Sequence, residues 1–206
     1  IICPSYIHIE LLIKNNTGRN FYVGSQDCSD KSDGAFTGEI SASMLKNLGC
    51  SHVIIGHSER RSKYSESNQL LKDKVSEAIN NNLIPIFCCG EEALERKNGT
   101  HFDKISEQLD VLFDINDLKS TIIAYEPVWS IGTNKTPSDK EIKDMHIYIK
   151  NYLMKKTSSN NISVLYGGSV NPENASSILK IPEVDGVLVG GASLSPEKFR
   201  LICSTI

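Results

Sequence analysis

The sequence contains no apolar run approaching the roughly 20 residues that a membrane helix needs. No basic segment followed by an apolar stretch marks a secretory signal. The 206 residues carry 22 Lys and Arg against 25 Asp and Glu, a formal net charge of −3. That balance gives no reason to expect nucleic acid or an anionic lipid surface as a partner. We therefore expect no membrane and no nucleic-acid partner.

Closely spaced cysteine pairs are also lacking. There are six cysteines, but no C-x-x-C spacing occurs among them, which argues against a zinc site or a redox motif. Free thiols in a reducing cytoplasm are the expectation. The cysteines are Cys3, Cys28, Cys50, Cys88, Cys89 and Cys203.

What the sequence does contain is a regular alternation of apolar runs and amphipathic stretches. Helical periodicity marks residues 67–82 and 138–155. Near-continuously apolar strands separated by helices indicate a buried parallel sheet. The strand-like runs are residues 1–3, 21–26, 52–57, 84–89, 121–126, 163–166 and 186–189.

Seven strands at intervals of about 30 residues have the spacing of βα units. A (β/α)₈ barrel typically needs about 250 residues, so a 206-residue chain is short by roughly one unit. An open doubly wound sheet remains an alternative, disfavoured because no G-x-G-x-x-G fingerprint occurs. With no low-complexity linker, residues 1–206 are predicted to form one α/β barrel domain.

Polar or glycine-rich residues follow the strand-like runs, where barrel enzymes place their chemistry. Glu126 ends an apolar strand, and apolar neighbours make a carboxylate harder to ionise and so better suited as a general base. His57 ends another strand just before a possible helix start, which favours neutral imidazole. Taken singly, Glu126 could be a solvated loop residue and His57 a core or surface histidine.

Three loops have a character of their own. Gly168-Ser169 and Gly190-Gly191 suit a phosphate cradle, because glycines let backbone N–H groups approach an anion; tight turns are the alternative. Residues 127–136, with a proline at one end and glycine near the tip, suit a lid, although a plain surface connection is possible. Residues 34–39 read as a projecting loop with an apolar tip, a plausible partner contact.

Together these segments are very specific. Gly-His-Ser-Glu-Arg-Arg (56–61), Tyr-Glu-Pro-Val-Trp-Ser-Ile-Gly-Thr (125–133), Tyr-Gly-Gly-Ser-Val (166–170) and Gly-Val-Leu-Val-Gly-Gly-Ala-Ser-Leu (186–194) resemble four signatures of triosephosphate isomerase, in its order and spacing. Gly-Ala-Phe-Thr-Gly-Glu (34–39) resembles that family's dimer loop. The resemblance covers the whole chain.

The resemblance implies interconversion of dihydroxyacetone phosphate and glyceraldehyde 3-phosphate through an enediolate, in glycolysis and gluconeogenesis, by a cytoplasmic homodimer without metal or organic cofactor. Glutamate base and neutral histidine electrophile are this family's known pairing. The implied site residues are Glu126, His57 and Glu59 for catalysis; Gly132, Ser169, Gly190 and Gly191 for the phosphate; Pro127, Trp129, Ile131 and Thr133 in the lid, residues 127–137; and Thr37, Glu39 and Arg60 at the dimer contact, with Arg60 as ion partner of Glu39.

The chain departs from the family in two places. It is expected to lack the first strand and helix and part of the second strand, including an Asn-x-Lys pair whose lysine is catalytic. That loss would leave Glu59 a buried carboxylate without its cation, and this chain alone is predicted to be nearly inactive. In the lid, Pro137 has no N–H to meet the hydroxyl of Tyr166, so closure is expected to use other contacts.

Two other functions compete with isomerisation. A Schiff-base aldolase on a phosphate-binding barrel needs a lysine at an inner strand end, and no strand-like run ends in one. The other is a catalytically impaired barrel remnant that binds phosphorylated ligands or serves as a structural or interaction protein. It would keep the phosphate loops and lack the catalytic lysine.

Overall fold

The computed structural model describes residues 1–18, 20–113, 115, 121–133, 136–156 and 162–205. The chain divides into two compact units. The first unit comprises residues 1–88 and 111–122, and the second comprises residues 89–110 and 123–206. The prediction that residues 1–206 form one domain stays a prediction.

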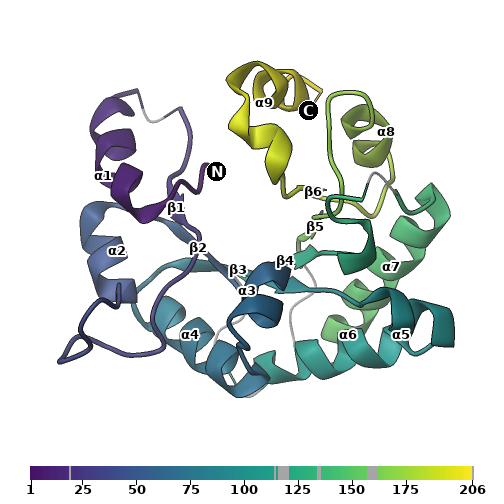
Figure 1. The fold of residues 1–206 in the computed structure, drawn as a ribbon, viewed down its shortest axis with the longest axis horizontal. Coiled ribbons are helices and arrows are strands. Elements are labelled where there is room, and N and C mark those ends of the chain that lie inside the picture. Colours follow the sequence, from purple (N-terminus) through teal and green to yellow (C-terminus); the bar gives the residue numbers. More distant parts are fainter. Residues whose placement is uncertain (19, 114, 116–120, 134–135, 157–161, 206) are drawn as a thin grey trace. The chain divides into compact units, whose positions relative to one another are not determined.

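The first unit is built on parallel strands (Figure 1). Strand β1 (Gly24–Ser25) pairs with β2 (His52–Ile55), which pairs in turn with β3 (Ile84–Cys89). His52 of β2 lies opposite Gly24 of β1 on one side and Ile84 of β3 on the other. The helices of this unit are α1 (Tyr6–Asn15), α2 (Ala42–Leu48), α3 (Ser58–Lys63) and α4 (Asn68–Asn80).

Helix α4 shows how the sequence pattern becomes packing in this unit. Ser67 caps it by accepting a hydrogen bond from the backbone N–H of Leu70, which satisfies a donor that a helix start leaves unpaired. Leu71, Val75 and Ala78 then fall on one face and are fully buried. All four residues of β2 are buried as well, as expected for a parallel strand covered on both faces.

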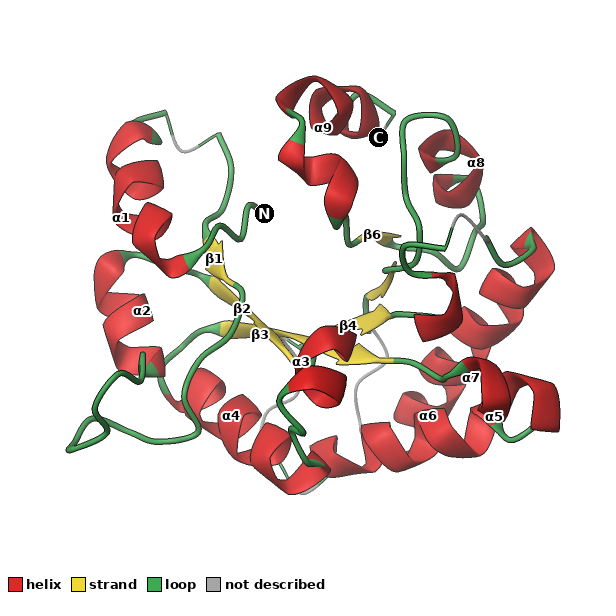
Figure 2. Cartoon of the chain, in the orientation of Figure 1, coloured by secondary structure: helices red, strands yellow, loops and turns green. Residues whose placement is uncertain are grey.

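The second unit repeats the strand and helix alternation (Figure 2). Strand β4 (Ile122–Tyr125) pairs with β5 (Val164–Tyr166), and β5 pairs with β6 (Gly186–Val187), all parallel. Parallel strands need crossover connections, which the helices supply. These helices are α5 (Ala93–Asn98), α6 (His101–Leu109), α7 (Asp139–Lys156), α8 (Ala175–Leu179) and α9 (Pro196–Cys203). Short 3₁₀ turns among the described residues are η1 (Asp110–Leu112), η3 (Val128–Ser130) and η4 (Gly191–Leu194).

Six of the seven predicted strands are present: β3 has the predicted bounds, and the other five are shorter than the apolar runs that predicted them. The largest contraction is in residues 21–26, where only Gly24–Ser25 form a strand. Residues 1–3 do not form one, because Ile2 makes a single parallel bridge to Val23. The helices predicted at residues 67–82 and 138–155 are confirmed as α4 and α7. No helix in the described ranges is long and apolar enough to cross a membrane.

Candidate active site

Glu126 follows directly after β4 and is 2% exposed. Its backbone N–H donates to the carbonyl of Cys89 at 2.8 Å, so the residue continues the parallel pairing just beyond the strand end. The N–H of Gly167, in the loop after β5, donates to the carbonyl of Tyr125 at 2.7 Å. Glu126 is therefore a buried carboxylate held between two strand-end loops, not a solvated loop residue.

The backbone around Glu126 fits only because residue 90 is glycine. A Cβ on Gly90 would lie 1.7 Å from the carbonyl oxygen of Glu126, well inside any allowed contact. Gln108 of α6 completes this close approach, because its side-chain amide accepts from the N–H of Gly90 at 2.8 Å and donates to its carbonyl at 3.0 Å. The sequence pattern did not single out Gln108, a buried polar residue on an otherwise apolar helix face.

The predicted lid begins with the 3₁₀ turn η3. The N–H of Val128 donates to the carbonyl of Glu91 at 3.1 Å, and the indole Nε1 of Trp129 donates to Oε1 of the same residue at 2.8 Å. The hydroxyl of Tyr125 donates to that oxygen too, at 3.1 Å. Glu91 is fully buried, and burial raises the pKa of its carboxyl, although these donors partly oppose the rise.

The start of the lid is also tied to a predicted phosphate loop. Ser169 donates from its hydroxyl to the carbonyl of Ser130 at 2.7 Å. Gly168 makes room for this contact, because a Cβ there would lie 2.1 Å from the hydroxyl oxygen of Tyr166 and 2.8 Å from Oγ of Ser130. The structure thus joins Ser130, at the start of the predicted lid, to Ser169 of a predicted phosphate loop.

The glycines predicted to bind phosphate lie in the open. Gly132, Gly190 and Gly191 are all exposed, and a Cβ added to any of them would meet no atom of the described residues within 4 Å. Gly132 has a φ of 69°, a backbone conformation that other residues rarely adopt. Ile131 and Thr133 of the lid are described, whereas Asn134 and Lys135 lie outside the described residues.

In the first unit, His57 is the N-cap of α3. Its Nδ1 accepts from the backbone N–H of Glu59 at 3.3 Å, which requires that nitrogen to be unprotonated. The arrangement fits an imidazole whose Nδ1 carries no proton, and the role expected of His57 stays a prediction. Glu59 itself is exposed, so the expectation that it is a buried carboxylate is wrong.

Arg60 belongs to an ion network that the sequence reasoning missed. Its Nη2 lies 2.9 Å from Oδ2 of Asp27 and 2.8 Å from Oε1 of Glu66. Lys74 reaches the same two carboxylates at 2.8 and 2.6 Å, although only 6% of its side chain is exposed. Lys74 lies on the apolar face of α4, where the helical periodicity of the sequence predicted only hydrophobic residues. Nothing in the neighbouring sequence indicated its carboxylate partners.

The predicted dimer loop projects as expected. Thr37 and Glu39 are exposed, and Phe36 remains 44% exposed at the tip. The base is closed by Asp33, whose carboxylate accepts hydrogen bonds from the hydroxyls of Ser41 and Ser43 at 2.7 and 2.6 Å. A short loop fixed at its base and apolar at its tip is suited to enter a partner.

Comparison with known proteins shows to which family the chain belongs. The family model for triosephosphate isomerase matches residues 1–206. The triosephosphate isomerase of Cytophaga hutchinsonii is 44% identical over 97% of this chain and 81% of that protein. That of Vesicomyosocius okutanii is also 44% identical, over 98% of this chain and 84% of its own. The chain belongs to the triosephosphate isomerase family.

The fold of this triosephosphate isomerase family member is the (β/α)₈, or TIM, barrel fold. The crystal structure of triosephosphate isomerase from Bartonella henselae superposes on 99% of this chain and 85% of its own with a TM-score of 0.90, at 37% identity. The chain is accordingly an isomerase, and the predicted family and fold class are confirmed.

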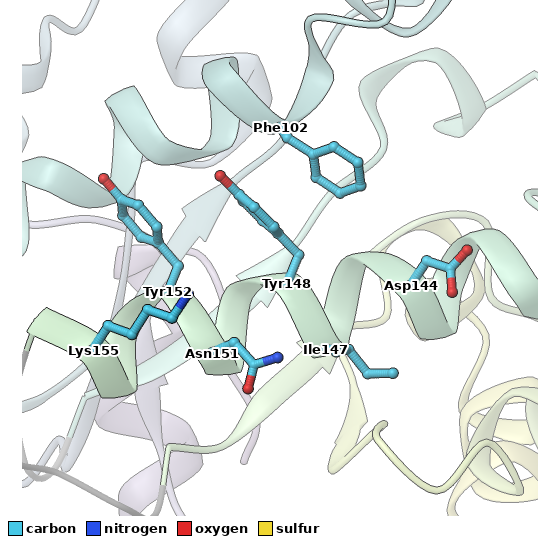
Figure 3. A pocket seen from close by; sticks show the side chains of 7 residues that line it. All are labelled: Phe102, Asp144, Ile147, Tyr148, Asn151, Tyr152 and Lys155. Carbon is cyan, nitrogen blue, oxygen red and sulfur yellow. The ribbon is translucent and has the colours of Figure 1, made fainter.

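The hollow in Figure 3 is not part of the site predicted for this isomerase. It has a volume of about 280 Å³ and lies between Phe102 of α6 and one side of α7. The α7 residues that line it are Asp144, Ile147, Tyr148, Asn151, Tyr152 and Lys155. The rings of Tyr148 and Tyr152 are stacked with centroids 5.9 Å apart. Tyr152 is half-buried beside this hollow, whereas His146 is buried on the core face of α7.

No group of three His, Cys, Asp or Glu side chains suited to a metal ion occurs among the residues that the structure describes. The expectation that this family member works without metal or cofactor stays a prediction. The polar groups that surround Glu126 and the lid are hydrogen-bonded to one another, an arrangement that can position a proton-transfer group and shield it from water.

Proposed function

We propose that this family member interconverts dihydroxyacetone phosphate and glyceraldehyde 3-phosphate, with Glu126 as the base that moves a proton between the two carbons flanking the carbonyl. The 206 residues alone are expected to turn over only weakly, because the family's Asn-x-Lys pair is not among them. The observation that carries the proposal is the burial of Glu126 at the end of β4, beside a lid start that Glu91 and Ser169 hold in place. A carboxylate shielded from water and fixed in orientation suits proton abstraction next to a carbonyl.

His57 polarises the carbonyl and shuttles protons between the enediolate oxygens. Its Nδ1 accepts from the N–H of Glu59, which supports a neutral ring whose other nitrogen can donate. Glu59 is assigned a supporting catalytic role through the family motif, and its exposure leaves it free to meet a cation. Neutral histidine is well matched to the enediolate, because the proton it gives and recovers is shared between groups of similar basicity.

The substrate phosphate is bound by backbone N–H groups of Gly132, Ser169, Gly190 and Gly191. The open space beside the three glycines supports close approach of an anion to the backbone. The lid, residues 127–137, closes over the bound substrate with Pro127, Trp129, Ile131 and Thr133. It excludes water and keeps the enediolate from losing its phosphate.

The proposal extends to assembly and location. Two copies associate as a homodimer through the projecting loop, with Thr37 and Glu39 entering the partner. Arg60 would have to share its charge with Glu39, because Asp27 and Glu66 of its own chain already contact it. The reaction is a step of glycolysis and gluconeogenesis in the cytoplasm, without a metal or organic cofactor. No observation favours the alternative of a binding or scaffold remnant.

Replacing Glu126 tests the catalytic assignment. Glu126→Gln keeps the shape and removes the base, so kcat for glyceraldehyde 3-phosphate should fall by about 10³-fold or more, within the range of general-base contributions. Glu173→Gln, at an exposed glutamate on the same unit, is the matched control and should leave kcat unchanged. A loss of less than about tenfold for a folded Glu126→Gln protein would reject Glu126 as the base.

A further inference from the structure

We propose that Arg96, which lies outside the lid, is a positioning residue that ties the first turn of the lid to the helix that follows the lid. The proposal rests on the isomerase function, since the lid has a catalytic purpose only there. Arg96 stands in α5, and 18% of its side chain is exposed. It faces one residue of the lid and one residue just beyond the lid's other end.

The first contact is with the start of the lid. The guanidinium carbon of Arg96 lies 5.7 Å from the ring centroid of Trp129, within the range of a cation–π interaction. Its Nε lies 3.7 Å from Oε1 of Glu91, the oxygen that accepts the indole N–H of Trp129. The indole is therefore held at its edge by a buried carboxylate and on its face by a cation.

The second contact is with the helix after the lid. Glu141, in the first turn of α7, uses Oε2 to accept from the backbone N–H and the hydroxyl of Ser138, both at 2.8 Å. Its other oxygen, Oε1, lies 3.6 Å from Nη2 of Arg96. Ser138 directly follows Pro137, the last lid residue, so Glu141 fixes the point where the lid ends and Arg96 reaches that point by charge.

One cation thus stands between two carboxylates that anchor opposite ends of the same loop. Nη2 of Arg96 is buried and donates no hydrogen bond within the described part of the chain. A shift of well under 1 Å would bring Nη2 and Oε1 of Glu141 within hydrogen-bond distance. The planar guanidinium suits this position, because it can stack on the indole while its nitrogens point to both carboxylates.

The test uses Trp129 as its own reporter. It is the one tryptophan of the 206-residue chain, so its fluorescence and acrylamide quenching report the start of the lid directly. Arg96→Gln should increase quenching of Trp129 and lower kcat by about tenfold, the scale of a desolvated cation–π contact combined with a partly buried ion pair. Phosphate released per isomerisation should rise, because a looser lid admits water to the enediolate.

Two further variants separate positioning from general stability. Arg96→Lys keeps the charge but loses the planar guanidinium group. Its Trp129 quenching and its kcat should therefore be intermediate between those of wild type and Arg96→Gln. Lys97→Gln changes an exposed cation of the same helix and should match wild type in every measurement. Circular dichroism and thermal unfolding would establish that each variant is folded. If Arg96→Gln does not fold, Arg96→Lys still tests the proposal.

A double-mutant cycle tests the link between the two lid ends. Glu141→Gln should by itself increase Trp129 quenching, although Glu141 does not contact the indole, and should add little in the Arg96→Gln background. Unchanged quenching in both single variants would overturn the proposal whatever their activity. If Glu126→Gln kept the same turnover as wild type, the proposed function would fall, while the quenching comparison would still decide whether Arg96 links the lid ends.

Discussion

The two units bury carboxylates in opposite ways. In the Lys74 cluster of the first unit (Asp27, Arg60, Glu66 and Lys74), two carboxylates meet two cations at 2.6 to 2.9 Å. In the second unit, the fully buried Glu91 receives neutral donors from Tyr125 and Trp129, and its cation stands 3.7 Å away. The first arrangement neutralises charge by contact, whereas the second neutralises it mainly by hydrogen bonding.

The difference matches what each place has to do. In the Lys74 cluster, hydrogen bonds from Lys74 and Arg60 outweigh burial at Glu66 and lower its pKa, whereas burial prevails at Asp27 and raises its pKa. Burial prevails at Glu91 and raises its pKa. A fully paired ion network resists movement, because breaking one pair strands a charge in a buried site. Neutral donors can part from a carboxylate at lower cost, which suits the start of the proposed lid.

The largest effect is expected from breaking the Lys74 cluster. Lys74→Met leaves Asp27 and Glu66 with Arg60 alone, and the free energy of unfolding should fall by about 3 to 5 kcal/mol, the usual cost of removing one partner of a buried pair. Urea unfolding measures the loss, and Lys63→Met, at an exposed lysine of α3, is the control. A loss below about 1 kcal/mol would mean that the network behaves like a surface ion pair.

A smaller effect is expected where the donor is neutral. Tyr125→Phe removes the hydroxyl that donates to Oε1 of Glu91 and should lower the free energy of unfolding by about 1 to 2 kcal/mol, because the Trp129 donor remains. The same change at the exposed Tyr22 should cost almost nothing. If Tyr125→Phe proved as costly as Lys74→Met, the contrast between the two clusters would be lost.

The smallest effect is a difference in pH dependence. The folded pKa of Glu91 lies above its ordinary value of 4.5, so the folded protein binds more protons there than the unfolded chain. This stabilisation is complete below the ordinary value and is lost as pH rises through the folded pKa. Relative to Glu91→Gln, wild type should lose stability over that range by at most about 1.4 kcal/mol per pH unit.

Unfolding free energies of wild type and Glu91→Gln, measured from pH 4 upward in matched buffers, would reveal this slope. At Glu66 the sign is opposite, because its folded pKa is lowered and its stabilisation is lost as pH falls through that value. A difference between wild type and Glu91→Gln that stayed flat, or that grew in favour of wild type with rising pH, would contradict the account of Glu91.

Sequence reasoning located what depends on local pattern. The apolar runs found six strands, and the residues that follow them included Glu126, His57 and Ser169. It failed where burial depends on partners that are distant in the sequence. The helical period of α4 predicts a buried apolar face, but Lys74 can lie on that face only because folding brings Asp27 and Glu66 next to it. Gln108 and Arg96 escaped notice for the same reason, since neither belongs to a motif.

Gly90 has no side chain, yet the placement of the proposed base depends on it. Any Cβ at this position would displace the carbonyl of Glu126 and, with it, the carboxylate that takes the proton. Random replacement of residue 90 under selection for isomerisation should therefore return glycine alone, as if the position were part of the catalytic machinery. A residue can be required for a reaction because of the volume that it leaves empty.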